Sequence, residues 1–232
     1  MSRRLLVTGA VLIVLALATR FALERIQIPD EFNPWAPLQI AQEPNFLTQY
    51  KLSRASSDAQ LCRAALEQTS WQYTPLDNEI TAPGCGYTNA VRIEHMGMGV
   101  SSPFAVSCRE ALSLAMWERH VVEPAAQRYF ALPITKLEHF GSYACRTLYG
   151  RPNASMSHHA TADAFDFAGL VIGGEKRIRV VRDWNGSGPE AKFLREIHDG
   201  ACNYFDSVLG PNYNAAHRDH FHLDRGRYKV CR

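Results

Sequence analysis

The stretch SHHATADAFD, residues 157–166, and the stretch HRDHFH, residues 217–222, together decide how this chain is expected to fold. Zinc binds imidazole nitrogen and carboxylate oxygen readily, and a catalytic zinc site keeps three protein ligands and one open position for water. We therefore expect one zinc site that is split between the two stretches, with two ligands from the first and at least one from the second. Such a ligand set would make the protein a zinc hydrolase.

The first stretch predicts a turn followed by a strand. His159 and Asp166 are seven residues apart, and an odd spacing along one strand would place them on opposite faces. The small and polar residues 161–163 suit the turn that must intervene, so Asp166 is expected to open the following strand. Because Asp166 lies between two phenylalanines, its carboxylate is expected to be half-buried and paired, or bound to a metal.

The second stretch predicts a strand near residues 220–224 that carries histidines on one face. His220 and His222 are two residues apart, which is the repeat of one strand face. His217 lies just upstream, so three of the nine histidines of the chain fall within six residues. The alternative interpretation is an exposed or pH-sensitive loop.

Hydrophobic periodicity predicts both helices and strands elsewhere in the chain. Helices are expected over residues 59–68, 107–124 and about 190–209. Strands are expected over residues 134–145, 164–172, 177–184 and 220–224. Gly173-Gly174 predicts a hairpin between the second and third of these strands. The mixture predicts an α+β fold in which an antiparallel sheet carries the zinc site, helices pack on the sheet and disulfides cross-link it.

The cysteines indicate an oxidising compartment. The chain has six, at positions 62, 85, 108, 145, 202 and 231, and none forms a C-x-x-C pair. An even number of widely spaced cysteines in an exported protein predicts three disulfides. The pairing stays open, because six cysteines allow 15 connectivities. Buried free thiols are the alternative.

The composition is that of an ordinary globular protein. The chain has 232 residues, of which 46% are hydrophobic and 21% are charged, enough for one good core or two small ones. The formal net charge is only +2, and no basic stripe is present. A nucleic-acid partner is therefore not expected.

The N-terminal part predicts three segments. Residues 1–23 carry a basic head and an uncharged, mostly apolar run over residues 5–19, as in a membrane anchor or signal segment. The run is shorter than the ~20 residues of a typical span, and residues 16–18, ALA, resemble a cleavage site, although we expect an uncleaved anchor. Residues 24–54 contain several prolines and predict a tether without regular structure. The folded domain is then expected over residues 55–232.

The histidine pattern is similar to that of a known group of enzymes. Ser157-x-His159 followed by Asp166 and the His220-x-His222 pair resembles the lysostaphin and D-Ala-D-Ala metallopeptidase superfamily. In that group the first histidine, the aspartate and the last histidine bind zinc, so the resemblance implies Zn²⁺ on His159, Asp166 and His222. The spacing of His217, His220 and His222 also resembles the penicillin-insensitive murein endopeptidases, in which the two histidines that do not bind zinc serve catalysis.

A closer resemblance is to the bacterial extensin-like C-terminal family, over about residues 30–232. It is carried by the His159 motif together with FGSYACR at 140–146, DW at 183–184 and NAAHRDHFH at 214–222. His158 occupies a position that is often acidic in that family, and Asp163 one that is often Gly or Asn. His158 is an alternative ligand, but His159 keeps the seven-residue spacing to Asp166.

The sequence leaves alternatives for two catalytic roles, the group that stabilises the oxyanion and the general base. Related D-Ala-D-Ala peptidases use an arginine upstream of the first zinc histidine, and Arg146 lies thirteen residues before His159. It would stabilise the oxyanion of peptide hydrolysis, or it is an ordinary surface arginine.

Relatives place the general base three residues before the last zinc ligand, where Asp219 stands. On a regular strand Asp219 would face away, so we expect His220 to be the base, with His217 assisting and Asp219 as the alternative.

These resemblances imply an exported zinc-dependent peptidase or amidohydrolase that acts on peptide bonds of the cell wall. The expected partners are cell-wall peptide as substrate and the membrane through the N-terminal segment. The expected location is the inner membrane, with a single pass and a periplasmic C-terminal domain, or the periplasm if residues 1–18 are cleaved. The rival hypothesis is a non-catalytic wall-binding or scaffold module that keeps the peptidase fold.

Overall fold

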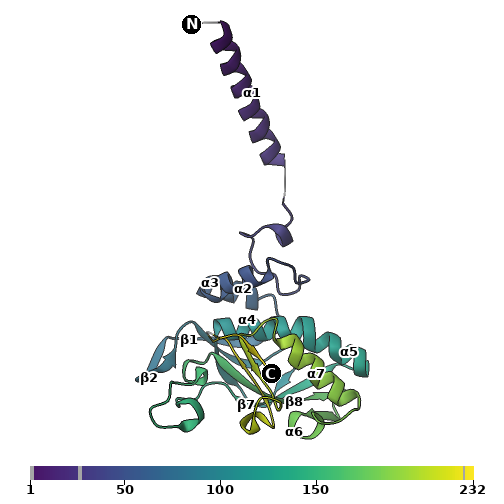
Figure 1. Cartoon of the computed structure of the whole chain (residues 1–232). Helices are drawn as coiled ribbons and strands as arrows, with labels where there is room; N and C mark the ends of the chain where they lie inside the picture. Colours follow the sequence, from purple (N-terminus) through teal and green to yellow (C-terminus); the bar gives the residue numbers. More distant parts are fainter. Residues whose placement is uncertain (1–2, 26–27, 227) are drawn as a thin grey trace. The chain divides into compact units, whose positions relative to one another are not determined.

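The structure is a computed structural model that describes residues 3–25, 28–226 and 228–232. The chain divides into two compact units, one that ends at Ala36 and one that begins at Pro37 (Figure 1).

The first unit contains helix α1 (Arg3–Arg25) and the 3-10 turn η1 (Asp30–Phe32). In the part of the chain that the structure describes, which includes α1, no helix is long and apolar enough to cross a membrane. The uncharged run of residues 5–19 is shorter than the ~20 residues that a span needs. The expectation of a single-pass inner-membrane protein is therefore wrong.

The second unit is built on a large sheet in which most neighbouring strands are antiparallel. The strand order is β12-β10-β11-β8-β7-β5, and β9 also pairs with β8; the β10–β12 and β5–β7 pairs are parallel. The strands are β5 (Gly99–Val100), β7 (Ile134–Gly141), β8 (Ala164–Ile172), β9 (Lys176–Arg179), β10 (Ser207–Leu209), β11 (Phe221–Asp224) and β12 (Val230–Cys231).

Strand β8 lies at the centre of this sheet. Its sequence is almost continuously apolar, as expected for a strand that is covered on both faces. Asp166 is the one residue of β8 that is only partly buried. The central strand therefore opens to the surface at the position of the predicted metal ligand.

Strand β9 ends earlier than the sequence predicts. A strand was expected over residues 177–184, but β9 covers Lys176–Arg179 and is followed by the helical turn α6 (Val180–Asp183). The reason lies in β8, whose residues 169–172 pair with β9 and whose residues 164–167 pair with β11 on the same edge. Beyond Arg179, β9 has no partner left. The predicted hairpin is confirmed, since β8 and β9 pair antiparallel up to Ile172 and Lys176. Gly173 and Gly174 in the connecting turn both have positive φ, at 61° and 84°.

A smaller antiparallel sheet and a hairpin complete the strands that the structure describes. The sheet has the order β1-β4-β6, and β2 pairs with β3. Their bounds are β1 (Gln72–Leu76), β2 (Glu79–Ala82), β3 (Cys85–Tyr87), β4 (Ala90–His95) and β6 (Phe104–Ser107).

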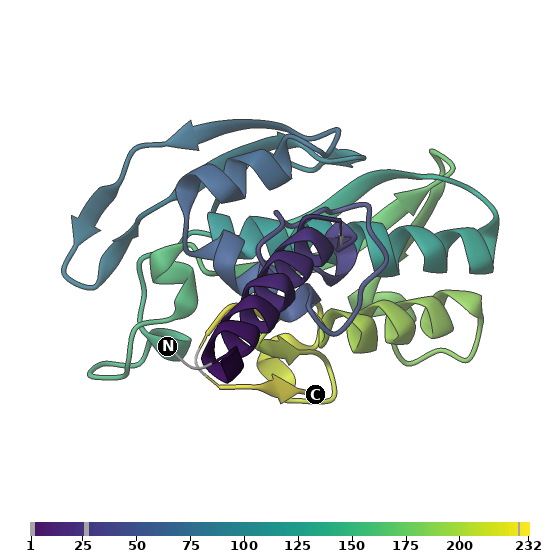
Figure 2. The ribbon, with the colours of Figure 1, turned by 90° about the horizontal axis from the view of Figure 1, so that it is seen from above.

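The helices of this unit pack around the sheets, and α5 and α7 lie side by side (Figure 2). They are α2 (Thr48–Ser56), α3 (Ala59–Leu66), α4 (Cys108–Trp117), the π-helical turn η2 (Glu118–Val122), α5 (Glu123–Phe130) and α7 (Pro189–Ala201). Ser107 caps α4, because its hydroxyl accepts a hydrogen bond from Glu110 N–H. Pro124 does not end this helical run. It stands in the first turn of α5, where its missing N–H is tolerated.

The core fixes which way the site residues face. The Trp117 ring of α4 lies 5.3 Å from the Phe167 ring of β8, which in turn lies 5.4 Å from the Phe221 ring of β11. Both phenylalanines are fully buried. Successive residues of a strand point to opposite faces. Burial of Phe167 and Phe221 therefore turns the next residues, Asp166 and His222, to the other face of the sheet.

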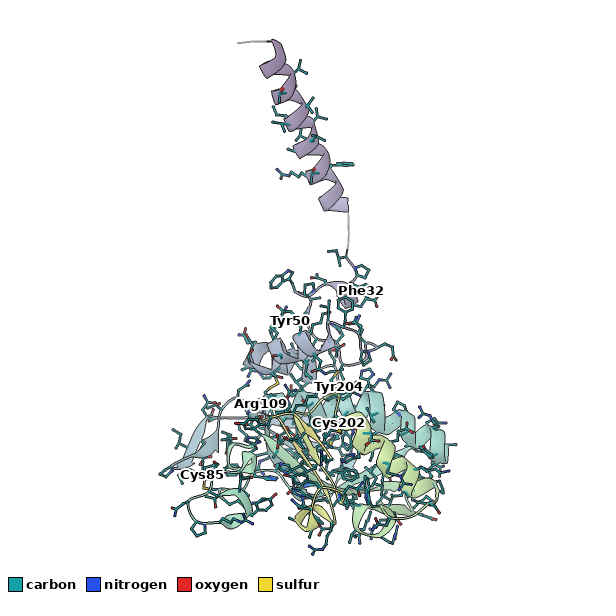
Figure 3. All side chains as sticks on the ribbon, in the orientation of Figure 1. Phe32, Tyr50, Cys85, Arg109, Cys202 and Tyr204 are labelled. Atoms are coloured by element: carbon teal, nitrogen blue, oxygen red, sulfur yellow. A yellow bond between two sulfur atoms is a disulfide. The ribbon has the colours of Figure 1, made fainter. Side chains whose placement is uncertain are left out.

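Three disulfides cross-link the second unit, as predicted, and the structure settles their pairing. The pairs are Cys62–Cys108, Cys85–Cys145 and Cys202–Cys231. The labelled Cys85 and Cys202 belong to two of them (Figure 3). The second pair joins β3 to the loop before the first histidine stretch, and the third joins the end of α7 to β12. The α+β class with antiparallel sheets and disulfides is confirmed.

The predicted helix over residues 190–209 is wrong in its second half. Helix α7 ends at Ala201, and residues 207–209 form β10. Hydrogen bonds from Asn203 and Tyr204 N–H back to residues 200 and 201 close the helix. Val208 then pairs with Leu223 of β11, a contact with a distant residue that periodicity does not reveal.

Part of the predicted tether has regular structure and buried side chains. Helix α2 begins at Thr48, and the expected domain start at residue 55 falls inside it. Leu38 and Ile40 are buried in the core. The Gln68 amide holds this extended segment, because it donates to Leu38 C=O and accepts from Ile40 N–H, both at 3.0 Å. The expectation of no regular structure over residues 24–54 is therefore wrong for α2.

Candidate metal centre

His222 and Asp166 come together across two neighbouring strands. The antiparallel pairing of β11 with β8 places them directly opposite each other. Their side chains share one face of the sheet, and His222 Nδ1 lies 3.0 Å from Asp166 Oδ1. The pairing therefore supplies two of the three predicted metal ligands.

The third predicted ligand comes from a short helical turn. The 3-10 turn η4 (His158–Thr161) begins after Ser157, whose hydroxyl accepts from His159 N–H, and ends at Ala162 in the left-handed conformation with φ of 56°. The predicted turn between His159 and Asp166 is thus present, although β8 begins at Ala164 and not at Asp166. The turn brings His159 Nε2 to 3.2 Å from Asp166 Oδ1 and 3.1 Å from His222 Nδ1.

The hydrogen bonds of the two imidazoles leave one nitrogen of each for a metal. His159 Nδ1 lies 2.5 Å from the backbone carbonyl of Ser142, so it donates there and leaves Nε2 as the acceptor. His222 Nε2 lies 3.0 Å from Asp224 Oδ2, which leaves Nδ1. Ligand atoms of His159, Asp166 and His222 lie within 4.8 Å of one another. Two imidazole nitrogens and one carboxylate oxygen fit the preferences of zinc.

The electrostatics of the trio couple metal binding to protons. Burial opposes ionisation of Asp166, but the adjacent imidazoles of His159 and His222 outweigh it and hold the pKa of the carboxyl well below its usual range. Burial disfavours the charged form of His222, yet its bonds to Asp166 and Asp224 raise its pKa to about 9. Without a metal His222 is therefore protonated near neutral pH. A metal ion must displace that proton, so its affinity falls as the pH is lowered.

His220 lies beside the trio. It precedes β11, and its Nε2 is 3.6 Å from Asp166 Oδ1. Its Nδ1 lies 2.9 Å from Asp219 Oδ1. Because a carboxylate only accepts hydrogen bonds, Nδ1 carries the proton, and Nε2 of the neutral ring holds a lone pair on the side of the metal centre. Asp219, the alternative base, is thus the partner of His220.

His217 closes another side of the site. The Asn214 side-chain oxygen accepts from Ala216 N–H at 2.9 Å and lies 2.8 Å from His217 Nδ1, so His217 donates through Nδ1 and keeps Nε2 as an acceptor. Its ring centre is 5.2 Å from that of His220 and 5.8 Å from that of His222. Burial, helped by the positive charge of His222, lowers the pKa of His217 to about 4. His217 is therefore neutral at neutral pH.

Arg146 lies next to the first stretch in the backbone but is exposed to solvent. Its carbonyl accepts a hydrogen bond from Ser157 N–H at 3.0 Å, and the preceding Cys145 is tied to Cys85. This hydrogen bond places the backbone of Arg146 beside Ser157, two residues before His159.

Most of the chain matches one protein family. A family model described as the extensin-like protein C-terminus matches residues 60–232. The chain belongs to this extensin-like family. The matched range contains the whole candidate metal centre. No curated protein and no solved structure matches the chain. None of these comparisons supports the expected relationship to the lysostaphin and D-Ala-D-Ala metallopeptidases.

Three residues that contact the histidines of the candidate metal centre were not predicted from the sequence: Ser142, Asn214 and Asp224. Asp224 follows His222 by two residues and so shares its strand face. The strand repeat that paired His220 with His222 could have found it. Ser142 contributes a backbone carbonyl, which no sequence motif reveals. Asn214 caps the turn η5 (Ala215–His217), and an Asn ahead of a turn is a signal for such a cap.

Proposed function

We propose that this extensin-like protein is an exported zinc-dependent peptidase or amidohydrolase that acts on peptide bonds of the cell wall. The observation that carries the proposal is the convergence of His159 Nε2, Asp166 Oδ1 and His222 Nδ1, with His217 and His220 beside them. Three ligands and two further histidines suit a catalytic centre better than a closed structural site. Export is supported by the three disulfides.

Zinc, when bound, acts as a Lewis acid and lowers the pKa of a bound water to ~7. His220 then serves as the general base, because its Nε2 lone pair faces the site while its Nδ1–H donates to Asp219. The Asp219 carboxylate orients the ring and stabilises the imidazolium that forms when Nε2 takes a proton. In this arrangement Asp219 acts through His220 and is not itself the base.

His217 and Arg146 have supporting roles in the proposal. Asn214 holds His217 with Nε2 as an acceptor, so the ring binds a donor group of the substrate or assists the proton transfer. Arg146 stabilises the negative oxygen that develops during hydrolysis, which is worth ~10²- to 10³-fold for a single donor at such a position. This role rests on its place in the chain before His159 and next to Ser157.

The choice of cell-wall peptide as substrate rests on the residue pattern shared with wall peptidases and on the surroundings of the histidines. Phe140, which is 62% exposed, lies with its ring 5.7 Å from that of His220. Tyr213, which is 42% exposed, lies 5.6 Å from His217. Exposed aromatic rings next to polar catalytic groups are typical of a surface that binds a substrate.

The test is a zinc analysis of the purified chain together with a digest of purified peptidoglycan. We expect one zinc ion per chain and the release of new amino groups from the wall peptide. Activity should disappear with a chelator and return with zinc. A chain that binds zinc and wall polymer but cuts no bond would support the non-catalytic wall-binding module. A chain that binds no zinc would refute the metal centre itself.

A further inference from the structure

Asp224 lies on the far side of His222 from the candidate metal and makes contacts in two directions. Its residue is 4% exposed. Oδ2 lies 3.0 Å from His222 Nε2. Oδ1 accepts from Gly226 N–H at 2.8 Å and lies 3.2 Å from His158 Nδ1. A buried carboxylate with partners on both oxygens is well held in place.

We propose that Asp224 is a positioning residue that fixes His222 with Nδ1 toward the metal and joins the two histidine stretches. The inference rests on the metal centre proposed above. A carboxylate offers only acceptors, so His222 keeps the proton on Nε2 that it donates to Asp224, and Nδ1 is the nitrogen that gives up its proton to a metal. A partner of this kind on a ligating histidine fixes both ring orientation and tautomer.

The contact with His158 extends this role to the first stretch. His158 immediately precedes the ligand His159, whereas His222 belongs to the second stretch. The metal ligands link the two stretches once. Asp224 links them a second time, on the side of His222 that faces away from the metal site. Gly226 makes room for it, since a Cβ at that position would lie 2.1 Å from Cε1 of the His158 ring. His158 was the alternative metal ligand. We assign it instead the structural role of contacting Asp224.

The variant Asp224→Asn in the full chain tests the inference. Asparagine has nearly the same shape but only one acceptor oxygen, so either His222 or the pair of Gly226 and His158 loses its acceptor. We expect zinc affinity, measured by competition with a chelator, to fall by about 10- to 100-fold. The matched control is Asp163→Asn, which removes a buried carboxylate that bonds to Arg109. It should leave zinc affinity unchanged.

A second measurement needs no variant. Nitrogen-15 NMR of the zinc-loaded wild-type chain should show His222 bound to the metal through Nδ1 and carrying its proton on Nε2. Metal on Nε2 would overturn the inference, and so would Asp224→Asn that binds zinc like the wild type or Asp163→Asn that weakens binding equally. Failure of the wild type itself to bind zinc would instead refute the proposed function, and the inference with it.

Discussion

His222 stands directly opposite Asp166 in the antiparallel β8–β11 pair, with Nδ1 of the imidazole 3.0 Å from Oδ1 of the carboxylate. The next pair along these strands is Phe221 with Phe167, and both rings lie in the core. A shift of one residue in the pairing would move the phenylalanines to the surface and both polar residues inward. The hydrophobic core therefore fixes the geometry of the candidate metal centre.

This geometry predicts that His222→Ala loses zinc and activity together. The substitution removes one of three ligands and leaves Asp166 and His159 as an incomplete site. Zinc content after dialysis, with turnover of wall peptide, measures both. His95→Ala is the control, because His95 is exposed on β4 of the smaller sheet. Full zinc occupancy in His222→Ala would contradict the assignment.

His220→Ala is expected to keep zinc but to lose most turnover. Its Nε2 is 3.6 Å from Asp166 Oδ1, farther than the nitrogens of the two histidine ligands. Help from a general base is worth ~10²- to 10⁴-fold in rate. Asp219→Asn should cause a smaller loss, since it only orients His220. If His220→Ala releases zinc as fully as His222→Ala, then His220 is a fourth ligand and the site is closed and structural.

The parts of the fold that local sequence dictates could be predicted. The apolar run of β8, the Gly173-Gly174 turn and the Ser107 cap each depend on residues close in the chain. The same holds for the turn between His159 and Asp166, which followed from their odd spacing. The strand repeat placed His220 and His222 together, although only His222 lies inside β11.

The parts that depend on distant partners could not be predicted. β9 stops at Arg179 because β11 takes the rest of the same edge of β8. Residues 207–209 become β10 because Val208 pairs with Leu223. Ile40 packs into the core, and the distant Gln68 and His120 bind its backbone. The local sequence pattern does not predict any of these pairings.

The disulfide next to the site should matter for metal binding, whereas a remote one should matter for stability alone. Cys145 follows Ala144, whose N–H bonds to His159 C=O, and Ser142 C=O binds the His159 ring. We expect removal of Cys85–Cys145 by paired alanine substitutions to weaken zinc binding. Removal of Cys62–Cys108 should lower the free energy of unfolding by ~2–4 kcal/mol with unchanged zinc affinity. Chelator competition and urea unfolding measure the two effects, and equal zinc affinity in both variants would contradict this division.

Glu118 should make the protein less stable as the pH rises from about 5 to 8. Its residue is 6% exposed, and burial raises the pKa of its carboxyl to about 7, although Trp71 Nε1–H and Gly97 N–H both bond to it. The unfolded chain releases this proton near its ordinary pKa of 4.5. Between these two values the native state binds more protons than the unfolded state, so the contribution of Glu118 to stability falls as the pH rises. The loss amounts to roughly 2–3 kcal/mol.

The variant Glu118→Gln isolates this contribution, because glutamine does not titrate. It leaves one of the two donors without an acceptor, a cost of ~1–3 kcal/mol that does not depend on pH. We therefore expect the free energy of unfolding of the variant, relative to the wild type, to improve by roughly 2–3 kcal/mol between pH 5 and pH 8. Glu138→Gln is the matched control, since its hydrogen bond with Arg179 lowers the pKa of Glu138 and places its titration below this range. Urea unfolding at the two pH values decides the matter: a constant difference between Glu118→Gln and the wild type would show that Glu118 is ionised throughout.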